Sequence, residues 1–146
     1  MQDYRKLRVW RHAHDLAIAT RAATRVFPAN GYSSLQSQMV RAAESIVFNV
    51  AEGCGASSQR EFARFLGISI KSTFELQAEC DLAKDYAILS IPAWEQLTAA
   101  LMSVRRMLFA LRKKVLFPLS GGPAKPSTVS GQPPTDPVSL HQEPST

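Results

Sequence analysis

The feature that most constrains the fold is residues 60–87, a stretch without proline and with a single glycine, Gly67. Apolar and small side chains recur along it at steps of three and four, which places them on one stripe of a helix. They are Phe62, Phe65, Leu66, Ser69, Thr73, Leu76, Cys80, Ala83 and Ala87. A helix of this length extends roughly 40 Å and is not stable alone in water. We therefore expect other apolar segments to pack against it, antiparallel, as a bundle.

The segment before Pro28 shows the same periodicity. A helix is predicted from about Leu7 to Phe27, because the residue before a proline is disfavoured in the helical conformation. Its apolar positions alternate at steps of four and three, as in a coiled-coil seam. They are Val9, Ala13, Leu16, Thr20, Ala23 and Phe27. The arginines of this segment lie mostly off the seam and are expected to face solvent; they are Arg8, Arg11, Arg21 and Arg25.

A second helix is expected after a turn at residues 28–31. Ser33 or Ser34 can cap it, because a hydroxyl accepts a hydrogen bond from an unpaired N–H of the first turn. It should stop near Gly53, since Gly53-Cys54-Gly55 is a strong helix-end signal. Its apolar stripe consists of Leu35, Met39, Ala42, Ala43, Ile46 and Val50.

Serine caps are predicted for the two later helices. Ser57 or Ser58 should cap the helix over residues 60–87, and with Ser58 as the cap, Glu61 three residues on completes a capping box. That helix should fade at residues 87–90, where Ser90 caps a fourth helix with Pro92 in its first turn. The fourth helix has the most regular seam, formed by Leu97, Leu101, Val104, Leu108, Leu111 and Val115.

These segments predict an all-α protein, an antiparallel up-down four-helix bundle in residues 1–117. Residues 118–146 hold seven of the nine prolines and no aromatic residue, so we expect a disordered C-terminal tail. The chain has no run of 18 apolar residues and no signal peptide, and its two cysteines suggest reduced thiols. We therefore expect a cytoplasmic protein that does not enter a membrane.

Basic residues supply the main functional indication. Residues 1–117 carry 16 lysines and arginines against 10 aspartates and glutamates, a net charge of +6. Cations recur on the second, third and fourth helices, and we interpret them as candidate phosphate contacts. The candidates are Arg41, Arg60, Arg64, Lys71, Arg105, Arg106, Lys113 and Lys114. An ordinary solvated face is the alternative, and charge alone does not decide between the two.

Catalytic and metal chemistry find little support. His12 and His14 are two residues apart and point to different helix faces, whereas a helical metal pair needs a spacing of three or four. A di-metal bundle site needs a Glu-x-x-His pair, which accompanies none of Glu44, Glu52, Glu75 and Glu79. Cys54 is more simply a small residue in a tight turn than a reactive thiol, and Cys80 belongs to the apolar stripe. We predict no metal, no cofactor and no enzymatic activity.

Three stretches resemble a known family. The first is Leu7-Arg8-Val9-Trp10 with Ala13 and Leu16. The most specific is Ser37-Gln38-Met39-Val40-Arg41-Ala42-Ala43-Glu44-Ser45-Ile46 leading to Asn49-Val50-Ala51-Glu52-Gly53. The third is Glu61-Phe62-Ala63-Arg64-Phe65-Leu66, with Glu75-Leu76 and Ala83-Lys84-Asp85. Together they resemble the four-helix-bundle proteins encoded in intervening sequences of bacterial 23S ribosomal RNA genes, over about residues 4–116.

The resemblance implies an up-down bundle that assembles as a ring, typically a homopentamer. It also implies kinship with accessory proteins of diversity-generating retroelements, which bind nucleic acid through basic surfaces and partner a reverse transcriptase. No catalytic residues are known for the family, so none are carried over. The family often has proline after the isoleucine of the second helix, whereas this chain has Val47. Without that proline a kink is lost, so a straighter second helix is expected.

The favoured hypothesis is a small cytoplasmic homo-oligomer that binds structured RNA or DNA electrostatically, with low sequence specificity. The alternative is a scaffold that docks a partner such as a reverse transcriptase without touching nucleic acid itself. Apolar residues off the seams indicate that more than one helix face is buried. They are Trp10, Ile18, Phe48, Ile68, Ile70 and Phe74.

Overall fold

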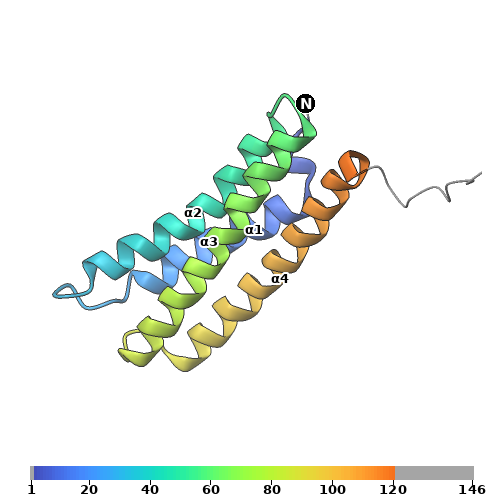
Figure 1. Ribbon diagram of the computed structural model, residues 1–146. Helices are drawn as coiled ribbons and strands as arrows, with labels where there is room; N and C mark the ends of the chain where they lie inside the picture. Colours follow the sequence, from blue (N-terminus) through green and yellow to red (C-terminus); the bar gives the residue numbers. More distant parts are fainter. Residues whose placement is uncertain (1, 121–146) are drawn as a thin grey trace, which may run out of the picture.

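Four long helices make up most of the described chain. The computed structural model describes residues 2–120, and Figure 1 shows its elements coloured in order along the chain. They are η1 (Tyr4–Lys6), α1 (Arg8–Thr24), α2 (Ser33–Cys54), α3 (Gln59–Asp85), α4 (Ile91–Leu116) and η2 (Phe117–Ser120). Within residues 2–120, no helix is long and apolar enough to cross a membrane.

The helices pack in a closed ring of neighbours. Helix α1 packs on α2, α2 on α3, α3 on α4, and α4 back on α1. The connections between successive helices have only eight, four and five residues, so each helix runs antiparallel to the one before it (Figure 1). The predicted all-α four-helix bundle is confirmed. Helix α2 continues without interruption through Val47.

The connection between α1 and α2 differs in detail from the prediction. Helix α1 ends at Thr24 rather than Phe27, and Phe27 is buried beyond the helix end, with its N–H donated to the Thr24 carbonyl. The N-cap of α2 is Tyr32, which makes no side-chain capping bond, so neither Ser33 nor Ser34 is the cap. The serines are the first two helical residues instead.

Serines cap both later helices, as predicted, and of the two candidates for α3 the cap is Ser58. The Ser58 hydroxyl accepts from the Glu61 N–H at 3.1 Å, and the Ser90 hydroxyl accepts from the Ala93 N–H at 3.3 Å. The reciprocal half of the capping box does not form, because the Glu61 carboxylate binds Arg64 instead. Hydrogen bonding by the serines satisfies N–H groups that have no partner within the helix.

Helix α3 ends two residues before Ala87, which was placed on its apolar stripe. Ala87 is exposed and has a φ of +60°, the left-handed conformation that usually falls to glycine. The Ile88 N–H bonds the Ala83 carbonyl and the Ala87 N–H bonds the Lys84 carbonyl, the two bonds of a Schellman motif. The helix was expected to fade slightly later, at residues 87–90, because alanine at the left-handed position gives no glycine stop signal.

The core consists of the predicted seams. Its largest fully buried apolar side chains come from all four helices; they are Leu16, Met39, Ile46, Leu66, Leu76, Leu101, Leu108, Val50 and Val104. Burial of each such side chain contributes about 1.5–3 kcal/mol. Ile70 was expected to need a second buried face, but it is 8% exposed within this bundle. Ile18, Phe48 and Phe74 do remain more than half exposed.

Small residues let α2 and α3 approach closely. Ala42 and Ala43 are buried, and the Ser69 hydroxyl donates to the Ile46 carbonyl at 2.9 Å. A Cβ added to Gly53 would lie 2.7 Å from the Phe62 ring and 3.2 Å from the Phe65 Cβ. The distinctive alanines and glycine of α2 therefore serve helix packing.

We expect Gly53→Ala to destabilise the protein by about 1–2 kcal/mol, because forcing Phe62 aside outweighs the ~1 kcal/mol gain in helix propensity. Gly67→Ala is the matched control, since its added Cβ would meet only the Arg112 Nε at 3.5 Å, an ordinary contact. Urea unfolding measures both. A Gly53→Ala variant as stable as Gly67→Ala would contradict the packing argument.

The boundary of the predicted tail is only partly described. Helix η2 spans Phe117–Ser120 and so crosses the expected limit between residues 117 and 118. The rest of the predicted disordered tail, residues 121–146, lies outside the described residues.

Candidate nucleic-acid interface

Seven of the eight candidate cations lie on the surface of the bundle. They come from α2, α3 and α4, and they are Arg41, Arg60, Arg64, Lys71, Arg106, Lys113 and Lys114. The eighth, Arg105, is 8% exposed. The set is therefore a mixture of surface cations and one internal arginine.

Arg105 does not decorate an outer face of α4, as the sequence suggested. Its guanidinium crosses to α3, where Nε donates to the Thr73 hydroxyl at 2.9 Å and Nη2 donates to the Thr73 carbonyl and to Gln77 Oε1. The guanidinium also lies 3.8 Å from the centre of the Phe74 ring. Burial lowers the pKa of Arg105. Its donors are used within the bundle, so we omit Arg105 from the phosphate-binding set.

Replacing Arg105 should therefore affect stability. Arg105→Ala leaves the Thr73 hydroxyl and Gln77 without their partner and removes packed side-chain atoms, so we expect a loss of about 2 kcal/mol. The adjacent Arg106→Ala is the matched control and should change stability by less than ~0.5 kcal/mol, because Arg106 is exposed. Thermal unfolding of the two variants tests this. Equal stabilities would show that the internal bonds of Arg105 contribute nothing.

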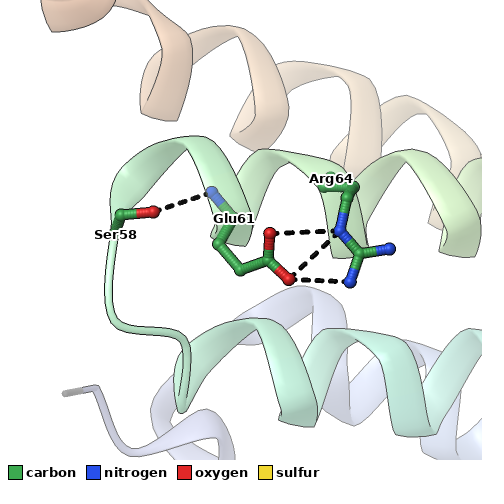
Figure 2. A network of polar contacts seen from close by, with 3 residues as sticks. All are labelled: Ser58, Glu61 and Arg64. Carbon is green, nitrogen blue, oxygen red and sulfur yellow. Dashed lines mark hydrogen bonds and ion pairs between the residues drawn. The ribbon is translucent and has the colours of Figure 1, made fainter.

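The start of α3 presents Arg60 and Arg64 one turn apart, with Lys71 two turns further on. Arg64 is engaged by Glu61, as Figure 2 shows, with Nη2 at 2.7 Å from Oε1 and Nε at 3.1 Å from both carboxylate oxygens. Arg64 hydrogen-bonds that carboxyl and lowers its pKa. Within residues 2–120, no carboxylate forms an ion pair with Arg60 or Lys71.

The end of α4 brings more cations to the same end of the bundle. Arg112 Nε donates to the Ala63 carbonyl at 3.2 Å, so the last turns of α4 lie against the first turns of α3. Lys114 lines a cavity of about 640 Å³ together with Ser57 and Gln59, which lie beside the α3 N-terminus. Lys113 and Lys114 thus lie at the end of the bundle that holds Arg60 and Arg64.

Arg41 belongs to a different face. It lines a groove between α1 and α2 together with Arg21 and Arg25. Both arginines are exposed, as predicted, but they were not among the predicted phosphate contacts. Their separation of 16 residues or more from Arg41 in the chain hides the grouping, because only the packing of α1 on α2 brings the two helices together.

Nucleophile and metal candidates have no support from the geometry. Burial raises the pKa of the Cys54 thiol, and burial with nearby Glu79 and Asp81 raises that of Cys80 to about 12. Both thiols are therefore poor nucleophiles near neutral pH. Among residues 2–120, no group of three His, Cys, Asp or Glu side chains has an arrangement that could hold a metal ion.

Comparison with known proteins identifies the fold family. The family described as 23S rRNA-intervening sequence protein matches residues 5–110, which is most of the bundle. No curated protein matches the chain.

Proposed function

Because the chain belongs to the 23S rRNA-intervening sequence protein family, we propose that it is a non-enzymatic protein that binds structured RNA through its basic surface. The observation that carries this proposal is the set of exposed cations on α2, α3 and α4, most of which lack a carboxylate partner within residues 2–120. Family membership indicates a connection with ribosomal RNA genes, and the exposed cations are the groups that would contact RNA phosphates.

Binding of this kind is electrostatic. Cations that neutralise phosphates release condensed counterions. The logarithm of the binding constant therefore falls linearly with the logarithm of the salt concentration. Contacts from guanidinium and ammonium groups to the phosphates of the RNA backbone carry no sequence information directly. We therefore propose low sequence specificity, with duplex DNA as a weaker or equal ligand.

Self-association is part of the proposal. Large apolar side chains remain exposed on several helices, among them Ile18, Phe48, Phe74 and Phe109, each 49–58% exposed. Exposed apolar surface of this kind is typical of protein contacts. A homo-oligomer, a pentamer by resemblance, would cover it and multiply the basic surface. Light scattering coupled to size exclusion measures the mass.

A partner-docking scaffold is the second candidate, favoured by the same exposed apolar side chains. In that case a protein such as a reverse transcriptase would occupy the surface, and nucleic acid would not bind directly.

Fluorescence anisotropy separates the two candidates. Labelled structured RNA and duplex DNA are titrated with the protein across a salt series. We expect affinity to fall steeply with salt, with a logarithmic slope near −4 if about five phosphates are neutralised. Absence of binding at low salt would refute the RNA-binding proposal and leave the scaffold.

A further inference from the structure

The groove between α1 and α2 brings together arginines that are far apart in the sequence. It has a volume of about 380 Å³. Its polar lining consists of Arg21 and Thr24 of α1, Arg25 at the C-cap of α1, and Gln36, Ser37, Arg41 and Glu44 of α2. Three guanidinium groups and a single carboxylate give this lining a formal charge of +2. The volume is at the lower end of the ~300–1,000 Å³ range of small-ligand sites, which suits one phosphate with its attached sugar.

Two of the three arginines are available to a ligand. Arg21 Nη1 lies 3.8 Å from Glu44 Oε1, an ion pair that joins α1 to α2 across the groove. Arg25 and Arg41 have no ion pair with any carboxylate in residues 2–120, and all three arginine residues are exposed. The groove therefore keeps uncompensated positive charge after its internal pair has formed.

The position of the helix ends adds little to the potential. Helix α1 ends at Thr24, beside the groove, where its partial charge is negative, and α2 begins at Ser33, where its partial charge is positive. These contributions oppose each other. The arginines thus determine that the groove attracts an anion.

We propose that this α1–α2 groove is a phosphate-binding site that holds one backbone phosphate of the bound RNA between Arg21, Arg25 and Arg41. The inference rests on the proposed function and names the site for it. Phosphate suits the lining because its oxygens point in several directions and accept from guanidinium forks on two helices at once. The Gln36 amide and the Ser37 hydroxyl can donate as well. An acidic peptide is the less suitable ligand, since its planar carboxylate offers two oxygens.

Glu44 has a distinct role in this site. Its carboxylate repels the phosphate and holds Arg21, so the incoming anion must compete with it. Removal of this single negative charge should therefore strengthen RNA binding. Removal of an exposed carboxylate outside the groove should not have this effect.

The test uses anisotropy with the full chain and labelled structured RNA. The groove variant Arg21→Gln, Arg25→Gln, Arg41→Gln is compared with a control of equal charge change, Lys6→Gln, Arg8→Gln, Arg11→Gln, at exposed positions outside the groove. We expect the groove variant to lose about tenfold or more in affinity, with a salt slope shallower by about one because one phosphate contact is lost, and the control to lose less than about threefold. Circular dichroism verifies that both variants fold.

Glu44→Gln should change RNA affinity in the opposite direction. It should raise RNA affinity about threefold or more, whereas Glu95→Gln, at an exposed position of α4, should not. Equal losses in the groove and control variants, with the unaltered protein binding RNA, would overturn the groove but leave the proposed function. Labelled poly-glutamate is titrated in parallel as an acidic peptide. If the groove variant loses poly-glutamate binding but keeps RNA binding, the groove is assigned to an acidic protein instead. Absence of RNA binding by the unaltered protein would overturn both.

Discussion

Reversing the charge of Arg60, Arg64 and Lys71 to glutamate is expected to weaken RNA binding by about 100-fold or more at low salt. The three side chains are exposed on one side of α3, and Arg60 and Lys71 have no carboxylate partner within residues 2–120. Each cation that contacts a phosphate contributes roughly 0.7–0.9 to the slope of log affinity against log salt. The variant should therefore show a slope shallower by about two to three.

A matched control separates position from net charge. Charge reversal of Lys6, Arg8 and Arg11, which are also exposed, changes the net charge by the same amount at another place. We expect this control to lose much less affinity. If both triple variants lose affinity equally, binding follows net charge alone and the α3 face has no special part. Unchanged affinity in the α3 variant would remove that face from the interface.

The second large effect concerns a carboxyl that the RNA proposal does not use. Glu79 lies on α3, is 7% exposed, and has a buried Oε2 without a hydrogen-bond partner in the described residues. Burial, with a smaller contribution from Glu75, raises the pKa of Glu79 to about 7. The protonated form is therefore favoured in the folded protein at mildly acidic pH.

The direction of the pH dependence follows from this pKa. In the unfolded chain the carboxyl ionises near its ordinary value of 4.5, whereas in the folded protein it keeps its proton up to about pH 7. The folded state binds more protons over this interval, so stability should fall as pH rises from about 4.5 to 7 and level off above it. The loss amounts to about 3 kcal/mol.

Glu79→Gln tests this expectation, because the amide is neutral at every pH. Relative to the parent protein, the variant should gain about 2–3 kcal/mol at pH 8 and little at pH 5, as measured by urea unfolding. Glu95→Gln, at an exposed position, is the control and should show no such pH-dependent gain. A Glu79→Gln variant whose advantage is the same at both pH values would contradict the pKa assigned to Glu79.

Local sequence patterns were sufficient to predict the four helices and the serine caps of two of them. The steps of three and four place Leu66, Leu76 and Leu108 in the core, where all three are fully buried. The hydroxyls of Ser58 and Ser90 accept bonds from residues three further along, so their roles depend only on neighbouring sequence. Such features are readable because the interacting groups are separated by one helical turn or a few turns.

Contacts between distant segments decided the remaining features. Arg105 occupies a position that its charge assigned to solvent, yet it bonds Thr73, 32 residues away, inside the bundle. Arg21 and Arg41 share a groove only because α1 packs on α2.

The sequence by itself determined the number of helices, their buried stripes, the basic excess and, through its motifs, the family. Only the tertiary structure decided which cations face solvent, which one hydrogen-bonds inside the bundle, and which come from different helices to line one groove. The physical reason is that hydrophobic periodicity and capping act over one or two helical turns, whereas the environment of a charge depends on every helix packed around it.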